Sequence, residues 1–305
     1  MKKVMLVVLS VVMALSLAGI AAAADKPVAY FCISHMTNAF TILASESMEA
    51  EAEAQGVELT VLSADQDINQ QVSQVEMAIT NGADVVIIEP VSAEGVMGVV
   101  KKAEDAGVHV VIYNQNISDP SIASTFCGVS NKDMGYMEMK AACEVLEGKG
   151  NVALLLGPLG SEGQLGRSAG YEKALEEYPD VKVVFEEDAQ WTVEEALKLT
   201  ENWISTGTQI DAVVSQNDNM ALGAVKAFKD AGIENIPAFG VDAVDDALVA
   251  VKEGRLTATV DQATALQSKL AIEAAVKLAN GEAVEAEYLA VPAIIDASNI
   301  DEYLK

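Results

Sequence analysis

Polar side chains follow short apolar runs in both halves of the chain, and their types suit hydrogen bonding to hydroxyl groups. Glu89 and Asn114 follow such runs in the first half, and Asn217 and Asp242 follow them in the second. A carboxylate accepts two hydrogen bonds, and a carboxamide both donates and accepts, so these groups can satisfy hydroxyls in pairs. Ligands of open α/β sheets bind beyond the carboxyl ends of the strands, so these positions predict a small-molecule site.

Two aromatic residues and one arginine are further candidates for this site. Phe40 and Trp191 stand at predicted strand-to-helix turns, where an aromatic face can cover the C–H side of a ring. Arg167 stands near the start of a predicted helix, after a glycine-rich turn. The alternative interpretations are core packing for the two aromatic side chains and a solvated surface position for Arg167.

The chain offers little that could form a catalytic site. Its two histidines are His35 and His109, and a lone histidine beside polar groups can act as a base. However, the sequence contains no recognisable Ser-His-Asp or Cys-His arrangement and no metal-ligand cluster. The glycines of residues 157–166 recur every third residue, which fits neither the dinucleotide nor the P-loop spacing. We therefore expect no enzyme, no catalytic residue, no metal and no cofactor.

The candidate residues belong to a regular alternation of strands and helices. Apolar runs alternate with stretches at helical spacing over residues 28–113 and again from residue 125 to residue 260. This pattern predicts parallel strands with right-handed crossovers and helices on both faces. Asp67 is expected to cap one helix, and Thr192 with Glu195 is expected to form a capping box at another. An extended tail should follow the last helix.

Two phrases recur in both halves of the chain. Residues 83–90 (ADVVIIEP) correspond to residues 210–217 (IDAVVSQN), and residues 105–114 (DAGVHVVIYN) correspond to residues 230–242 (DAGIENIPAFGVD). Two similar α/β lobes follow from this correspondence. If the carboxyl edges of their sheets face each other, the four strand-end residues line one cleft.

Composition limits the class of partner. With 305 residues, 51% of them hydrophobic, the chain can form two ordinary domains. Its formal net charge of −27 excludes nucleic acid as a partner, because an acidic surface repels phosphate backbones. Three cysteines are too few for a disulfide scaffold, and core packing is the favoured interpretation of Cys32 and Cys127, which lie in strand-like runs.

The first 24 residues have the pattern of a secretory signal peptide. Lys2 and Lys3 precede an apolar run over residues 4–20, and four alanines follow at residues 21–24. Cleavage is expected near Ala23 or Ala24. The alternative is an N-terminal membrane anchor, since the apolar run is long enough to span a bilayer. No cysteine follows the run directly, so no lipid anchor is implied, and we expect no membrane insertion after cleavage.

Four stretches of the chain resemble the ribose-binding-protein group of periplasmic sugar-binding proteins. They are Val28–Phe40 and residues 216–224, 240–242 and 257–262. The resemblance covers nearly the whole mature chain. It implies two Rossmann-like, doubly wound α/β lobes with parallel central sheets, joined by three crossing segments. It also implies a periplasmic protein that closes on one sugar and delivers it to a membrane ABC importer. We expect a monomer.

The resemblance also implies where the chain divides. The crossings are expected near Val129–Ser130, Gln262–Ala263 and Val291–Pro292. After the signal peptide (residues 1–24), the N-terminal lobe would comprise residues 25–129 and 263–291, and the C-terminal lobe residues 130–262 and 292–305.

Most of the site follows from the same resemblance, carried over residue by residue. Sugar contacts are implied for Asn38, Phe40, Arg167, Trp191, Asn217, Asp242 and Gln262. The chain departs from the ribose binder at two places. It has Glu89-Pro90 where that protein has Asn-Pro, and Asn114-Gln115 where that protein has an Asp-Arg clamp. We include Glu89, Asn114 and Gln115 in the predicted site and do not expect ribose itself as the ligand.

The charges of the predicted site favour a neutral ligand. Arg167 stands against two carboxylates, Glu89 and Asp242, so a sugar acid would meet unfavourable charge. A monosaccharide, an inositol or a linear alditol fits, and an amino-bearing ligand paired to Glu89 is a minor alternative. Two other classes of protein share the fold. A transcriptional regulator would carry a helix-turn-helix where this chain has its signal peptide, whereas a sensory protein that presents its ligand to a chemoreceptor remains an alternative to an importer component.

Overall fold

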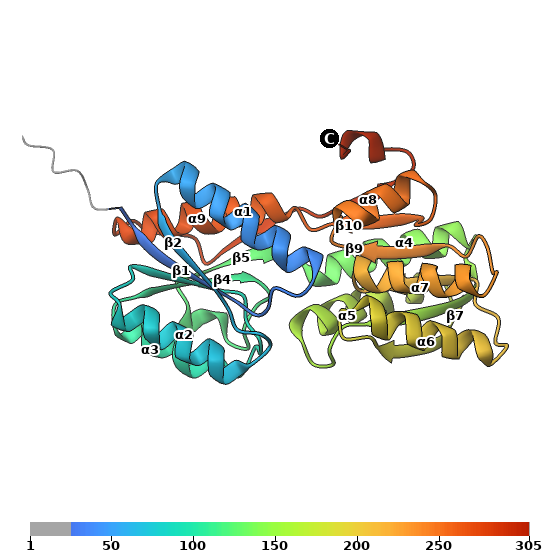
Figure 1. Ribbon diagram of the computed structural model, residues 1–305, viewed down its shortest axis with the longest axis horizontal. Coiled ribbons are helices and arrows are strands. Elements are labelled where there is room, and N and C mark those ends of the chain that lie inside the picture. Colours follow the sequence, from blue (N-terminus) through green and yellow to red (C-terminus); the bar gives the residue numbers. More distant parts are fainter. Residues whose placement is uncertain (1–25, 305) are drawn as a thin grey trace, which may run out of the picture.

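The computed structural model describes residues 26–304, which form two lobes lying end to end along the long axis of the molecule (Figure 1). The predicted signal peptide lies outside the described residues. No helix in residues 26–304 combines the length and apolar composition that a bilayer crossing requires.

The first lobe contains the N-terminal βα alternation. Its elements, in chain order, are β1 (Val28–Ile33), α1 (Ala39–Gln55), β2 (Glu58–Ser63), α2 (Ile68–Thr80), β3 (Val85–Ile88), α3 (Met97–Asp105), β4 (His109–Asn114), the 3₁₀ turn η1 (Pro120–Ile122) and β5 (Thr125–Val129).

The second lobe repeats the alternation. Its elements are α4 (Asn131–Val145), β6 (Lys149–Leu156), α5 (Glu162–Glu177), β7 (Asp180–Asp188), α6 (Val193–Ser205), β8 (Ala212–Ser215), α7 (Asp218–Asp230), β9 (Ala238–Val241), α8 (Asp245–Lys252) and β10 (Ala258–Asp261). The chain ends with α9 (Thr264–Ala279), β11 (Glu287–Ala290), β12 (Ala293–Asp296) and the 3₁₀ turn η2 (Ile300–Glu302).

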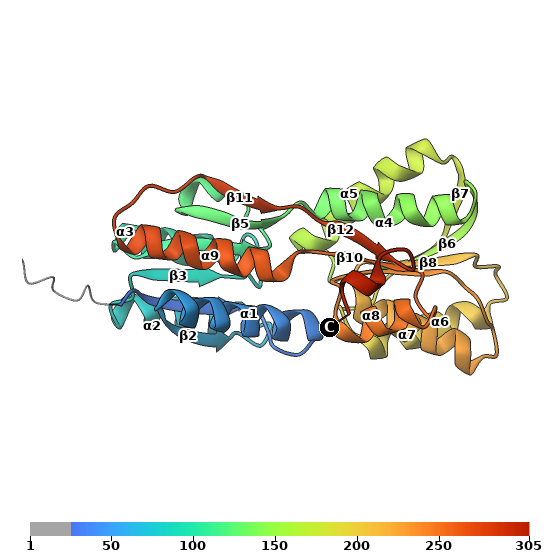
Figure 2. The ribbon, with the colours of Figure 1, turned by 90° about the horizontal axis from the view of Figure 1, so that it is seen from above.

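The two sheets of the described chain have matching strand orders. The first runs β11-β5-β4-β3-β1-β2, and the second runs β12-β10-β9-β8-β6-β7. The repeated phrases thus form β3 beside β4 in one lobe and β8 beside β9 in the other, which confirms two similar α/β lobes. All these pairs are parallel except β10 with β12, which is antiparallel. Helices α1 and α9 cover one face of the first sheet and α2 and α3 the other; in the second lobe α4 and α5 lie opposite α6 and α7 (Figure 1, Figure 2).

The chain passes between the lobes three times. It leaves the first sheet after β5 and returns after β10, so that α9 packs on α1 and β4 of the first lobe. It then runs directly from β11 in the first sheet to β12 in the second (Figure 2). The predicted fold class is confirmed. The exact lobe boundaries given above remain a prediction.

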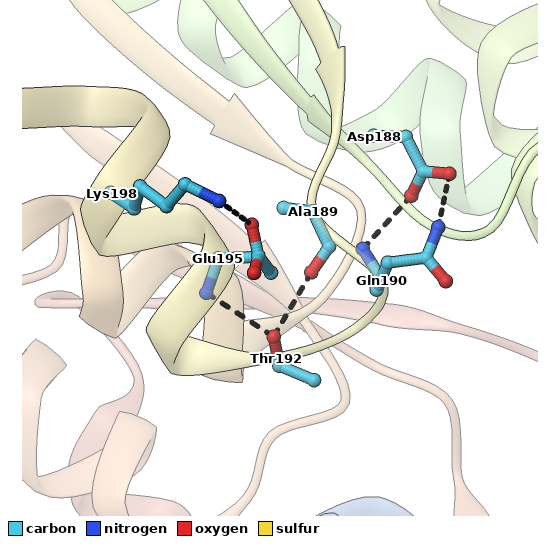
Figure 3. Close-up of polar contacts among 6 residues, drawn as sticks. All are labelled: Asp188, Ala189, Gln190, Thr192, Glu195 and Lys198. Atoms are coloured by element: carbon cyan, nitrogen blue, oxygen red, sulfur yellow. Dashed lines mark hydrogen bonds and ion pairs between the residues drawn. The ribbon is translucent and has the colours of Figure 1, made fainter. Parts of the chain in front are cut away.

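Local sequence signals account for several helix starts. Asp67 Oδ1 accepts from Asn69 N at 2.8 Å, as predicted for an N-cap. The predicted capping box at α6 is only half formed. Glu195 N donates to Thr192 Oγ1 at 3.3 Å, and the Glu195 carboxylate pairs with Lys198 (Figure 3). Thr192 N donates instead to Ala189 O at 2.9 Å.

The end of the chain is extended, as expected, but it is not a free tail. Its two strands add an edge strand to each sheet. The cysteine prediction is confirmed: Cys32 and Cys127 are buried in the core, as is Cys143, and none of the three is paired. Apolar clusters pack on both faces of each sheet, and the cluster under α1 and α9 continues into the second lobe. The carboxyl ends of both sets of parallel strands point toward the junction between the lobes (Figure 1).

Candidate functional site

A cavity lies between the lobes, where the carboxyl ends of the two sheets meet. It holds about 380 Å³ of space free of protein atoms, part of it open to solvent. All ten sequence-predicted residues line it: Asn38, Phe40, Glu89, Asn114, Gln115, Arg167, Trp191, Asn217, Asp242 and Gln262. Three further residues that we did not predict also line it: His35, Thr41 and Gly163. The structure thus gathers the whole predicted set, and its role in binding a ligand remains a prediction.

An asparagine caps one helix at the cavity in each lobe. Asn38 caps α1 by accepting from Thr41 N at 2.9 Å, and Asn217 caps α7 by accepting from Met220 N at 2.9 Å. Each cap fixes the carboxamide oxygen, so the amide nitrogen is the group left for other partners. Asn217 Nδ2 donates to Trp191 O at 3.3 Å and retains a second hydrogen for a ligand.

His35, which the sequence analysis considered only as a possible base, lies among polar side chains at the cavity. Its Nε2 lies 3.0 Å from Asn38 Nδ2, and its Nδ1 lies 2.8 Å from Ser34 Oγ. Because the cap turns the Asn38 amide nitrogen toward the ring, His35 Nε2 must accept that hydrogen bond. Burial lowers the pKa of His35, which favours the neutral ring that this arrangement requires.

Glu89, at the end of β3, is held by donors of its own lobe. Its Oε2 accepts from Ser34 N at 2.9 Å, and its Oε1 accepts from Gln115 Nε2 at 2.7 Å. The second bond orients the amide of Gln115 so that its Oε1 faces the other lobe, where Gly163 N donates to it at 3.4 Å. Burial raises the pKa of Glu89, opposed by the hydrogen bonds from Ser34 and Gln115.

A chain of side-chain hydrogen bonds crosses the floor of the cavity. Asn114 Nδ2, at the end of β4, donates to Gln262 Oε1 at 3.0 Å, and Gln262 Nε2 donates to Asp242 Oδ1, just after β9. Gln262 lies in a segment that crosses between the lobes, and its backbone carbonyl oxygen accepts a hydrogen bond from Gln267 Nε2 at 2.7 Å. The strand ends of the two lobes are therefore joined through one carboxamide.

The backbone at both strand ends is unusual for non-glycine residues. Asn114 has φ 59° and Asp242 has φ 125°, a region in which strain persists only when neighbours hold the residue. The loop after Asp242 is held by the buried carboxylate of Asp218, which accepts from Val244 N at 3.1 Å and from Thr259 Oγ1 at 2.7 Å. Asp218 thus stabilises the backbone that presents Asp242.

Arg167 is buried at the second lobe's side of the cavity, not solvated at the surface. Its Nε donates to Asn131 Oδ1 at 3.0 Å, its Nη1 donates to Gln216 O, and its Cζ lies 5.5 Å from the centre of the Trp191 ring. The remaining guanidinium hydrogens are available to a ligand oxygen. Trp191 packs so closely on Gly157 that a Cβ there would overlap the indole. This contact gives one reason for the glycine-rich turn.

Acidic groups lie in and behind the cavity. Burial raises the pKa of Asp242 to about 7, opposed by Arg167 and by the hydrogen bond from Gln262. Burial also raises the pKa of Glu138, behind β8, to about 8, although Tyr171 Oη donates to it at 2.6 Å. A ligand that donates hydroxyl hydrogens to these acceptors suits the cavity better than one that adds negative charge. Among residues 26–304, no cluster of three or more His, Cys, Asp or Glu side chains is arranged to hold a metal ion.

The comparisons with known proteins agree with this architecture. Residues 28–283 match the family model for the periplasmic binding protein domain. The chain belongs to the periplasmic binding protein family. The resemblance to its ribose-binding group is confirmed, because this periplasmic binding protein is 30% identical to the ribose import binding protein of Bacillus subtilis, over 83% of this chain and 82% of that protein.

Other relatives of this periplasmic binding protein have different names. It is 36% identical to a xylitol-binding protein of Mycolicibacterium smegmatis, over 87% of this chain and 76% of that protein. Among solved structures, an ABC transporter solute-binding protein from Bacillus halodurans C-125 with bound myo-inositol superposes with a TM-score of 0.87 at 33% identity, covering 91% of this chain and 97% of that one. These relatives are binding proteins, which agrees with the expectation that the chain is not an enzyme.

Proposed function

We propose that this periplasmic binding protein captures one small neutral polyhydroxy molecule between its lobes and delivers it to an ABC importer. The observation that supports this most is the cavity itself, which receives hydrogen-bonding side chains from both lobes. It also receives one aromatic side chain from each lobe, Phe40 and Trp191. The ligand class is a monosaccharide, an inositol or an alditol, bound by the ten residues that the sequence predicts.

The chemistry of the cavity supports a polyhydroxy ligand. Carboxylate and carboxamide oxygens of Asp242, Asn114 and Glu89 can accept from hydroxyls, while Arg167 and the amide nitrogen of Asn217 can donate to them. The aromatic side chains can cover C–H groups.

The burial of these residues indicates the closed form. Glu89, Asn114, Arg167, Asn217, Asp242 and Gln262 are all buried although each lines the cavity. A ligand that contacts both lobes binds the closed form more tightly than the open one, so binding shifts the equilibrium toward closure. In the proposed function, the importer recognises the closed lobes of a monomer in the periplasm.

The relatives' names guide the choice of ligands to test. Xylitol, myo-inositol and ribose appear in those names, and the Asn114-Gln115 pair argues against ribose here. Thermal unfolding of the mature protein should be measured with each of these three, with hexoses, with a sugar acid and with an amino sugar. A ligand that binds only folded protein raises Tm.

We expect at least one neutral sugar, inositol or alditol to raise Tm, and isothermal titration calorimetry to give one site per chain. A disaccharide such as trehalose, which is larger than the proposed ligands, controls at the same concentration for non-specific effects of hydroxyl groups. A Tm rise only with the sugar acid or the amino sugar would contradict the proposed ligand class. Reconstitution with a candidate ABC permease and its ATPase from the same genome would then test delivery, since a sensory protein would not stimulate that ATPase.

A further inference from the structure

The turn that carries Trp191 has an unusual backbone. Gln190 and Trp191 are consecutive non-glycine residues with φ of 55° and 61°. The left-handed conformation is unfavourable for residues with a Cβ. Such a conformation persists only where neighbouring groups hold it. The contacts around this turn must therefore stabilise it.

One carboxylate holds the turn from outside the cavity (Figure 3). Asp188, the last residue of β7, accepts from Gln190 N at 2.9 Å through Oδ1 and from Gln190 Nε2 through Oδ2. Its Oδ2 also accepts from Leu159 N at 3.3 Å, in the loop between β6 and α5. Asp188 therefore joins the Trp191 turn to the neighbouring loop, the one that begins with Gly157.

The position of the Trp191 indole depends on both of these loops. The ring packs directly on Gly157, and its Cζ2 lies 3.6 Å from where a Cβ on Gly163 would be. The guanidinium carbon Cζ of Arg167 lies 5.5 Å from the centre of the same ring. Rotation of the turn would therefore move the indole away from the glycines and from Arg167.

We propose that Asp188 is a positioning residue for ligand binding. It does not line the cavity; it fixes the left-handed turn at Gln190 and Trp191 and thereby sets the indole in its cavity position before a ligand arrives. An aromatic side chain held in this way binds without the entropy cost of ordering it on association. The effect on affinity rests on the proposed function, whereas the effect on the indole itself does not.

The tryptophan fluorescence of the ligand-free protein tests the positioning directly. The chain has two tryptophans, and Trp203 is buried with its Nε1 donating to Glu187 at 2.6 Å. In a Trp203→Phe background, Trp191 is the sole emitter. We expect Asp188→Ala to raise the acrylamide quenching constant of Trp191 at least twofold and to shift its emission to longer wavelength.

Two variants serve as controls. Glu186→Ala removes an exposed carboxylate from the same strand, β7, and should leave quenching unchanged. Asp188→Asn keeps one oxygen, which can accept from Gln190 N, but it replaces the oxygen that accepts from Leu159 N. The Trp191 quenching constant of this variant should therefore lie between those of wild type and Asp188→Ala. If Trp203→Phe does not fold, the same comparison is made with both tryptophans present, because buried Trp203 is shielded from acrylamide.

Calorimetry with myo-inositol and with xylitol supplies the affinity measurement. For whichever of them binds wild type, we expect Asp188→Ala to raise Kd at least fivefold and Glu186→Ala to leave it unchanged. Wild-type quenching in Asp188→Ala would overturn the inference, and so would a wild-type Kd. If neither polyol binds the wild-type protein, that result counts against the proposed ligand class, and the quenching measurement alone decides the role of Asp188.

Discussion

Asp242 links the two lobes at the scale of single residues. It accepts from Gln262 on the crossing segment, and its second oxygen has lone pairs that a ligand hydroxyl can use. We expect Asp242→Ala to raise Kd at least tenfold, about 1.4 kcal/mol, because buried donors in the protein and the ligand lose their acceptor. Asp246→Ala, an exposed site on nearby α8, is the matched control in calorimetry. Unchanged affinity of Asp242→Ala would remove this residue from the site.

Glu89 acts on the cavity partly through a neighbour. Both carboxylate oxygens of Glu89 now accept hydrogen bonds, one from Ser34 N and one from Gln115 Nε2. A glutamine at this position has only one oxygen, so it could accept only one of the two bonds. The Gln115 amide would then turn, so we expect Glu89→Gln to change the order of preference among sugars, inositols and alditols. The thermal-shift panel measures this order. An order identical to that of wild type would show that Glu89 does not influence selection.

At this scale the sequence predicts much of the cavity, but not all of it. Candidates such as Glu89 and Asn217 follow apolar runs, and such positions are readable from one chain, whereas Asn38 and Gln262 were expected only from the family resemblance. Thr41 and Gly163 were missed because their place depends on packing. Thr41 lies in the cavity because Asn38 caps α1 through Thr41 N, and Gly163 lies there because α5 brings it against Trp191. Asn38 was not predicted as an N-cap; that assignment would have placed Thr41, three residues later, beside the Asn38 side chain.

At the scale of elements, α4 and α5 pack closely through glycines. A Cβ on Gly170 would overlap backbone atoms of Lys132 and Tyr136 on α4, and backbone cannot move as a flexible side chain can. Overpacking costs about 1–3 kcal/mol. We therefore expect Gly170→Ala to lower the free energy of unfolding by at least about 2 kcal/mol. Because Arg167 lies one turn earlier on α5, ligand affinity should fall as well.

A glycine elsewhere provides the matched control for that substitution. Gly98 is exposed on α3, and a Cβ there would have no atom within 4 Å. Gly98→Ala should stabilise the protein by about 0.4–1 kcal/mol, because it reduces the entropy of the unfolded chain. Urea unfolding of both variants measures the difference. Equal effects of the two substitutions would contradict close packing between α4 and α5.

The element predictions failed where the outcome depended on partners distant in sequence. The final strands were predicted only as an extended tail, since β11 acquires its identity by pairing with β5 about half the chain away. The repeated phrases succeeded because they specify buried strands locally.

At the scale of the whole molecule, the acidic chain buries carboxylates as well as exposing them. Glu138 is fully buried on α4, and burial raises its pKa to about 8 from an ordinary value of 4.5. The folded state therefore binds this proton more tightly than the unfolded state does. The resulting stabilisation is fully present below pH 4.5 and is lost as pH rises through about 8. Asp242, with its pKa raised to about 7, acts in the same direction.

We therefore expect the Tm of ligand-free protein to fall as pH rises from 5 to 8, and Glu138→Gln to reduce that slope. A glutamine resembles the protonated carboxyl, since it keeps one acceptor for Tyr171 and one donor. Acidification also weakens repulsion among surface carboxylates, so Glu172→Gln, which removes an exposed charge from α5, is the control. Its slope should match that of wild type. If Glu138→Gln and Glu172→Gln give the same slope, the pH dependence comes from surface charge and not from the carboxylate buried behind the cavity.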